Sequence, residues 1–164
     1  MNRALIPSLQ LSSRAAAAAG ITVAIAHAAG LQFPVFAMIA AVIVTDIESS
    51  KTREQAIPRV IGTLAGGATG ALACYWMPPS AWAVAIAIFV PMFAFRALGM
   101  PDAAKLAGYV TALVVLQHSG DTRDAWLYAV DRVIETLLGV CVAVLVSFAP
   151  KVLSAEDDKT RPAP

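Results

Sequence analysis

Six apolar segments with few charges make up most of this sequence, and they constrain its fold more than any other feature. Proline, glycine or charged residues separate them, at about 15–31, 33–47, 59–77, 81–95, 103–117 and 131–149. Only 14% of the residues are charged, against roughly 25% in a soluble globular domain. We therefore predict an integral membrane protein.

The predicted lipid surroundings determine the fold class. In hydrocarbon each backbone amide must find its partner within the protein, which favours helices, and the alternation typical of a lipid-facing strand is absent. We predict an all-α bundle of about six short transmembrane helices. Some segments are shorter than the roughly 20 residues that a crossing needs, so they should extend into flanking residues or thin the bilayer locally.

Basic residues predict the orientation, because lysine and arginine accumulate in cytoplasmic loops. With the N-terminus inside, ten of the twelve basic residues are cytoplasmic, and only Arg123 and Arg132 are outside. Residues 1–14 then form a cytoplasmic N-terminus and 15–150 the transmembrane domain. The polar stretch 151–164 is predicted to be a disordered cytoplasmic tail.

The first apolar segment has a second interpretation. Arg3 and Arg14 precede a run that ends Ala26-His27-Ala28, which fits the cleavage pattern of a secretory signal peptide. Another apolar segment follows almost at once, so we favour a helical hairpin.

A stretch of eight residues occurs twice in the chain. RVIGTLAG at 59–66 recurs as RVIETLLG at 132–139, a shift of 73 with six of eight positions identical, and residues 36–44 align with 109–117 at the same shift. The chain is thus predicted to contain two three-helix units. Since three crossings is an odd number, the second unit should be inverted, as in many secondary transporters. Chance agreement or a simple packing duplication is the alternative.

Glycines mark a helix face in the repeat. Gly62, Gly66 and Gly70 are four residues apart, so they share one face and allow another backbone to approach closely. Gly139 is the counterpart of Gly66, and we assign all four to helix packing.

The counterpart of Gly62 is Glu135, an acid inside an apolar segment. Such an acid is costly in a membrane and often relays protons in transporters, so Glu135 is a candidate for proton coupling. An equally weighted alternative is a local ion pair of small energy with Arg132, three residues earlier. His118, near the same predicted outer end, can titrate near neutral pH and is a second candidate.

Arg59 and Arg132 begin their segments from opposite sides of the predicted membrane. Each guanidinium presents a planar fork of donors that suits a carboxylate, so we predict that both contact an organic anion. The alternative is that they reach lipid phosphates or neighbouring acids at the interface.

The two copies of the repeat, with the glycines at 62, 66 and 70, resemble the fusaric acid resistance and aromatic acid exporter superfamily of bacterial inner-membrane proteins. The resemblance covers about residues 15–150. It implies efflux of aromatic carboxylic acids driven by the proton gradient. Larger members carry a cytoplasmic domain and often a second six-helix block, neither of which is present in these 164 residues. We therefore expect a homo-oligomer, with the glycine stripe as a contact, and a possible periplasmic adaptor.

Taken together, the sequence predicts an inner-membrane protein that exports small organic, aromatic anions in exchange for protons. A passive anion channel and a non-transporting scaffold are the alternatives. The polar segments contain no nucleophile motif, metal cluster or nucleotide loop, so we expect no enzymatic activity, cofactor or metal. A net charge of +1 gives no reason to expect nucleic-acid binding.

Overall fold

The computed structural model describes residues 5–46, 49–78, 80–118 and 122–160, with side chains described over 8–46, 50–78, 80–117 and 124–148. The described residues form six helices and no strand. The helices are α1 Leu5–Ala28, α2 Pro34–Val44, α3 Ser49–Trp76, α4 Ala81–Ala97, α5 Pro101–His118 and α6 Thr122–Thr160. The predicted all-α class is confirmed, and each helix covers one of the six apolar segments.

Local sequence explains where several helices begin and end. Pro34 opens α2, where its fixed φ suits the first turn and its missing N–H costs nothing. The Ser80 hydroxyl caps α4 by accepting a hydrogen bond from the Ala83 N–H at 3.2 Å. Gly99, with φ of 75°, follows the end of α4 in the left-handed conformation that glycine adopts without strain.

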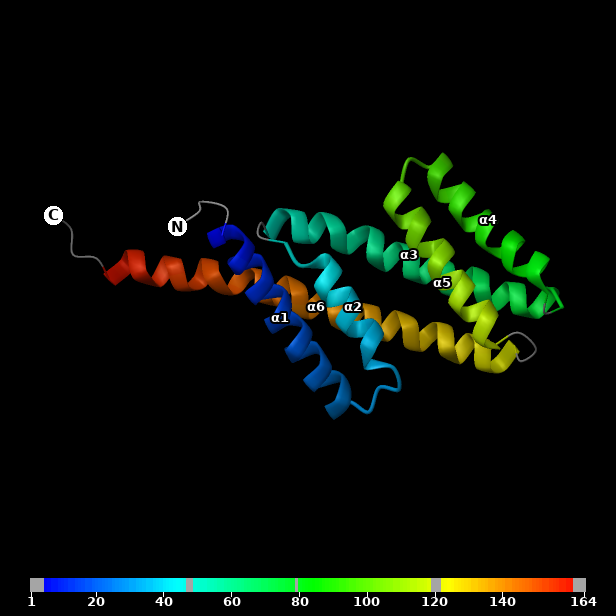
Figure 1. Cartoon of the computed structure of the whole chain (residues 1–164), viewed down its shortest axis with the longest axis horizontal. Coiled ribbons are helices and arrows are strands. Elements are labelled where there is room, and N and C mark those ends of the chain that lie inside the picture. The colour runs from blue at the N-terminus through cyan, green and yellow to red at the C-terminus, as the bar shows by residue number, and fades with distance from the viewer. Residues whose placement is uncertain (1–4, 47–48, 79, 119–121, 161–164) are drawn as a thin grey trace.

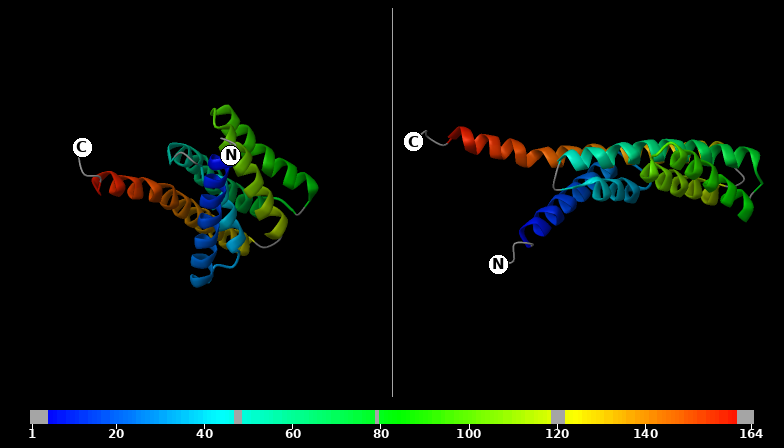
Figure 2. Two further views of the ribbon diagram at one scale, coloured as in Figure 1. Left: turned by 60° about the vertical axis from the view of Figure 1, so that its left-hand side comes forward. Right: turned by 90° about the horizontal axis from the view of Figure 1, so that it is seen from above.

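The long helices α3 and α6 lie side by side and run in opposite directions through the middle of the molecule (Figure 1). The hairpin α1–α2 packs on α6, and the hairpin α4–α5 packs mainly on α3. The right-hand view of Figure 2 shows the two hairpins on separate parts of the central pair. The packing of α2 on α6 thus parallels the packing of α5 on α3.

One contact joins the two copies of the eight-residue repeat. The hydroxyl of Thr136 on α6 donates to the hydroxyl of Thr63 on α3 at 3.4 Å. These two threonines are equivalent positions, 73 residues apart.

The glycine stripe of α3 lies against α5 within the same chain. A Cβ added to Gly62 would lie 2.6 Å from the Leu106 Cβ, and one added to Gly66 would meet the carbonyl of Ala107. Gly70 is equally close to α5. The stripe is therefore occupied by α5, which corrects our expectation that it forms a contact between copies of the chain.

Gly139 on α6 allows a similar close contact with α2. A Cβ there would meet the carbonyl of Ala37 and lie 2.9 Å from the Cβ of Ala40, both on α2. Each central helix thus uses glycine to bring the backbone of one hairpin into contact.

Helix α1 is packed into the fold. Its Ala18, Thr22 and Ala26 are fully buried, and the helix contacts both α2 and α6.

The C-terminal stretch differs from the prediction. Residues 151–160 continue α6 as a helix to Thr160, although the sequence led us to expect disorder from residue 151. Extending an existing helix fixes one residue for each new hydrogen bond and avoids the cost of nucleation. The polar sequence is therefore no obstacle to a helical backbone.

Large apolar side chains point outward while small ones fill the interior. Trp82, Phe89 and Phe93 are exposed, whereas alanine dominates the buried set. Among the described helices, Ser8–Ala28 of α1 is long and apolar enough to cross a membrane, and α2 and α4 are apolar but shorter. The 11 residues of α2 would span about 16 Å of a roughly 30 Å hydrocarbon core.

The close approach of α3 and α5 generates a stability prediction. Gly66→Ala should lower the free energy of unfolding by about 1–3 kcal/mol, because the new methyl group collides with backbone rather than with a movable side chain. Gly20→Ala is the matched control, since nothing lies within 4 Å of its added Cβ. It should be neutral or add up to about 1 kcal/mol through helix propensity. Thermal unfolding in detergent measures both, and equal midpoints would contradict the packing of α3 on α5.

Candidate functional site

Buried polar side chains follow the contact between α3 and α6. The set consists of Arg59, Thr63, Arg132, Glu135 and Thr136, all of them buried. The Thr63 hydroxyl donates to the Arg59 carbonyl at 2.9 Å and accepts from Thr136. Because the helices are antiparallel, Arg59 and Arg132 lie on opposite sides of the threonine pair, each about 6 Å away along its helix.

Arg132 and Glu135 form an ion pair inside the protein. Arg132 Nη2 lies 2.6 Å from Glu135 Oε2, and the side chains are only 2% and 1% exposed. The sequence allowed a weak local pair at this spacing, and the structure has the pair but buries it. Removing one partner from such a buried pair is costly because it leaves an uncompensated charge.

Glu135 also ties α6 to the beginning of α2. Its Oε1 accepts a hydrogen bond from the backbone N–H of Phe33 at 3.1 Å, and Phe33 is the residue that precedes α2. Backbone donors at a helix start have no partner within the helix. Glu135 on α6 therefore provides an acceptor for the Phe33 N–H, a backbone donor that has no partner within α2.

Three aromatic rings surround the Arg132 guanidinium. Its Cζ lies 3.9 Å from the ring centroid of Phe36, 4.6 Å from that of Tyr128 and 4.7 Å from that of Phe33. A desolvated cation–π contact contributes about 2 kcal/mol, so these rings compensate part of the cost of burying the charge. Sequence reasoning missed these rings because two of them come from a segment about a hundred positions earlier.

Arg132 retains donors that could hold an anion. Its Nη2 pairs with Glu135 Oε2, whereas Nε and Nη1 have no hydrogen-bond partner within the described part of the chain. A guanidinium with open donors can take both oxygens of a carboxylate.

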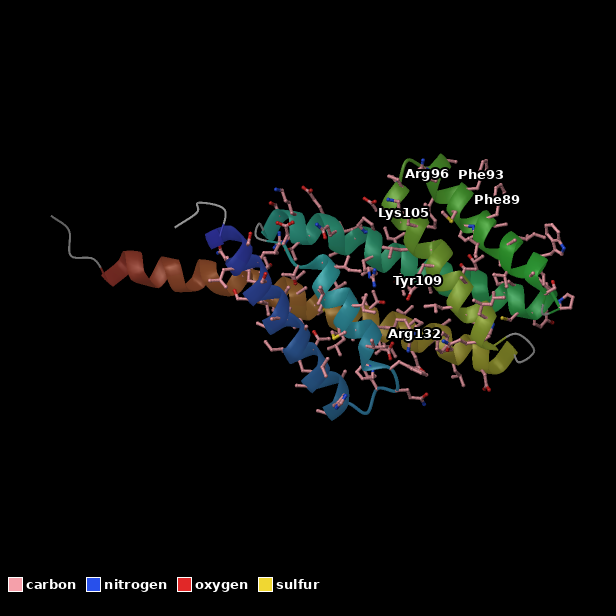
Figure 3. All side chains as sticks on the ribbon, viewed as in Figure 1. Phe89, Phe93, Arg96, Lys105, Tyr109 and Arg132 are labelled. Carbon is pink, nitrogen blue, oxygen red and sulfur yellow. The ribbon has the colours of Figure 1, made fainter. Side chains whose placement is uncertain are left out.

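Arg59 is the second buried cation, and its surroundings differ. It is 7% exposed, its Nε lacks a hydrogen-bond partner, and no acid pairs with it among the residues whose side chains are described. It lines a pocket of about 500 Å³ together with Ile43, Glu54, Gln55, Pro58, Asp102, Lys105 and Leu106. Tyr109 of α5 lies within electrostatic range of Arg59, one turn beyond Lys105 along the same helix (Figure 3). An unpaired buried guanidinium beside a pocket is suited to bind an anion.

A second pocket lies at the Arg132 end. It has a volume of about 350 Å³ and is lined by Gln32, Phe33, Gln117, Asp124, Leu127, Tyr128 and Asp131. Its walls are the starts of α2 and α6 and the end of α5. The Arg59 pocket is formed by the starts of α5 and α3 and the end of α2. The two pockets therefore use equivalent elements of the two halves.

The two arginines differ in their aromatic neighbours and in their acids. Phe36 lies against Arg132, whereas Tyr109, its counterpart in the sequence alignment, acts on Arg59 electrostatically. Glu135 is equivalent to Gly62, where the Leu106 side chain leaves no space for a larger residue. Only Arg132 therefore has an acid one turn away at this position.

His118 lies at the end of α5, and its side chain lies outside the described residues. Its role in proton coupling stays a prediction. Tyr109, Phe33, Phe36 and Tyr128 are the site residues that sequence reasoning did not find. The one signal for Tyr109 was its place opposite Phe36 in the repeat.

The helical fold and its buried arginines define a class of protein: an all-α bundle with charged groups in its interior. The model of the family described as fusaric acid resistance protein-like matches residues 20–146, and the chain belongs to that family. Membership confirms the resemblance noted in the sequence and gives the chain a membrane transport-related role. No curated protein and no solved structure matches the chain.

The burial of the Arg132–Glu135 pair generates a second prediction. Arg132→Met should lower the free energy of unfolding by about 3–5 kcal/mol, because it leaves the Glu135 carboxylate without a counter-charge. Adding Glu135→Gln to that variant should restore most of the loss. Lys105 and Asp102 form an exposed pair at the same spacing, 3.8 Å apart, and Lys105→Met should cost under about 1 kcal/mol. Similar losses for the two single variants, measured by thermal unfolding, would show that the buried pair carries no special weight.

Proposed function

We propose that this chain is a bacterial inner-membrane transporter that exports small organic anions, chiefly aromatic carboxylates, with a linkage to protons. The observation that carries the proposal is Arg59, a buried cation without an acidic partner among the described side chains, at the wall of a pocket of about 500 Å³. A volume of this size is usual for small-molecule sites.

The chemistry around Arg59 supports an aromatic carboxylate as the cargo. Its guanidinium fork can bind both carboxylate oxygens. Tyr109 is close enough to interact with Arg59 electrostatically, and its ring can pack against an aromatic ring of the cargo. Lys105 lines the same pocket, where it pairs with Asp102 at 3.8 Å.

Two equivalent pockets on opposite sides of one contact support transport rather than binding alone. In inverted-repeat transporters the substrate site lies between the halves, and rocking of one half against the other exposes it to each side in turn. Here the Thr63–Thr136 contact lies between Arg59 and Arg132. A cargo that passes from one arginine to the other would cross the place where the two halves meet.

Charge supports an outward direction. The basic residues at the starts of α3 and α5 place the Arg59 pocket on the cytoplasmic side in our proposed orientation, with both chain ends inside. The start of α1 and the end of α6 lie at the same end of the molecule, at the left of Figure 1. The pocket at the Arg132 end is not lined by Arg132 itself and contains Asp124 and Asp131. The Arg59 pocket contains as many acids, Glu54 and Asp102, as cations, so an anion would move from a pocket of balanced charge past carboxylates that repel it.

Glu135 is the group we propose for the link to protons. It is buried and pairs with Arg132. It also accepts a hydrogen bond from the N–H of Phe33, which lines the pocket at the Arg132 end, called the outer pocket below. Its charge decides whether Arg132 has a counter-ion within the protein. A buried acid in this position is typical of proton-linked transporters.

Arg59 can be tested by counterflow of labelled terephthalate in proteoliposomes of the purified protein. Arg59→Gln should reduce counterflow at least about tenfold, since a charged bond to a carboxylate contributes roughly 1.5–3 kcal/mol. Arg96→Gln removes an exposed arginine at the end of α4 and should leave the rate within about twofold. Counterflow by Arg59→Gln at the wild-type rate would remove Arg59 from the pathway.

Glu135 can be tested by the pH dependence of the same counterflow. Glu135→Gln should transport at a rate that no longer changes between pH 6 and pH 8, whereas the wild type should respond to pH. Arg96 is exposed and lines neither pocket, so Arg96→Gln should keep the wild-type response. Electrical current carried by the anion, with no dependence on pH, would indicate the passive channel instead.

A further inference from the structure

We propose that Glu135 is a built-in competitor of the cargo carboxylate for Arg132, so that an anion occupies the Arg132 site only together with a proton on Glu135. This inference rests on the proposed function and specifies how its two arginines differ. The Arg59 site, which has no such competitor among the described side chains, should bind the same anion without taking up a proton.

The geometry of Arg132 supports competition. Glu135 Oε2 lies 2.6 Å from Nη2, so a carboxylate from outside must displace it to reach that nitrogen. The displaced Glu135 carboxylate would be a buried charge without a counter-ion, which is strongly unfavourable. A proton on its Oε2 removes that charge. Its Oε1 can meanwhile keep the hydrogen bond from the Phe33 N–H.

The rings around Arg132 hold its guanidinium in place during such an exchange of partners. Phe33, Phe36 and Tyr128 contact it on several sides, and Nε and Nη1 have no hydrogen-bond partner among the described residues. The arginine is thus fixed by contacts that do not depend on Glu135, and it retains donors for a second oxygen.

The other charged groups near Glu135 are few. Arg132 and Asp131 of α6 act on it electrostatically, and Asp131 also lines the outer pocket. Helix α2 has no ionisable side chain and contributes the Phe33 N–H at its start. On α1, the ionisable side chain at this end is His27, which is exposed. On α3, Arg59 is separated from Glu135 by the Thr63–Thr136 contact. On α5, Tyr109 acts on Tyr128. Among the described side chains, Arg132 and Asp131 are therefore the charged groups that act on Glu135.

The sign of the linkage follows from this arrangement. If an anion at Arg132 favours a proton on Glu135, a proton on Glu135 must favour the anion by the same factor. Anion and proton would thus bind to the Arg132 site together, rather than in the exchange that the sequence led us to expect.

Calorimetry with benzoate on the purified, full-length protein tests this proposal. Titrations at pH 7.5 in two buffers that differ in ionisation enthalpy give the number of protons taken up for each benzoate bound. In Arg59→Gln, where Arg132 is the remaining site, about one proton should accompany each benzoate. Adding Glu135→Gln should abolish the proton uptake and tighten benzoate binding roughly tenfold, a usual size for coupled sites. Adding Arg96→Gln instead, which removes an exposed charge that lines neither pocket, should change neither value.

The outcomes separate this inference from the proposed function. If the wild type binds no benzoate, the proposed function fails. If the wild type binds benzoate but Arg59→Gln does not, Arg132 is not an anion site and the inference fails alone. Benzoate binding by Arg59→Gln without proton uptake, or an unchanged affinity after Glu135→Gln in a variant that elutes as the wild type does, overturns the inference as well.

Discussion

The ion pair between Arg132 and Glu135 is the interaction on which the first half of the fold and the candidate site both depend. It is almost fully buried, so its desolvation must be offset by its surroundings. The three rings and the Phe33 N–H supply that compensation, and they come from the turn between α1 and α2, from α2 and from α6. The pair therefore fixes where the first hairpin docks on α6.

Small residues make this burial possible. Gly139 follows Glu135 by one turn and brings α6 against the carbonyl of Ala37, so α2 lies close enough for Phe33 and Phe36 to reach Arg132. On the other side, Gly66 brings α3 against the carbonyl of Ala107. Close backbone approach is the usual way for helices to associate in lipid, where apolar burial gives little driving force. The small residues on α3 and α6 thus allow both the close helix packing and the burial of Arg132.

Much of the fold could be predicted from the sequence, and less of the site. Apolar runs bounded by proline, glycine and charge located all six helices, because local composition decides them. The cage around Arg132 could not be predicted, since it depends on how α2 docks on α6. The sequence also could not predict the register in which α5 packs on α3 and α2 packs on α6. Gly66 and Gly139 are 73 positions apart, but the carbonyls that they meet, at Ala107 and Ala37, are 70 apart. The gapless sequence alignment of the two halves is therefore offset from the packing by about one helical turn.

The difference between Gly62 and Glu135 shows why an imperfect repeat can be functional. Perfect equivalence would give Arg59 and Arg132 the same chemistry and the same affinity for an anion on both sides. At Gly62, Leu106 fills the space that an acid would need, so Arg59 has no counter-ion at this position, while on α6 the corresponding residue neutralises Arg132. Two arginines at equivalent positions of the repeat thus differ in whether a neighbouring acid occupies their donors.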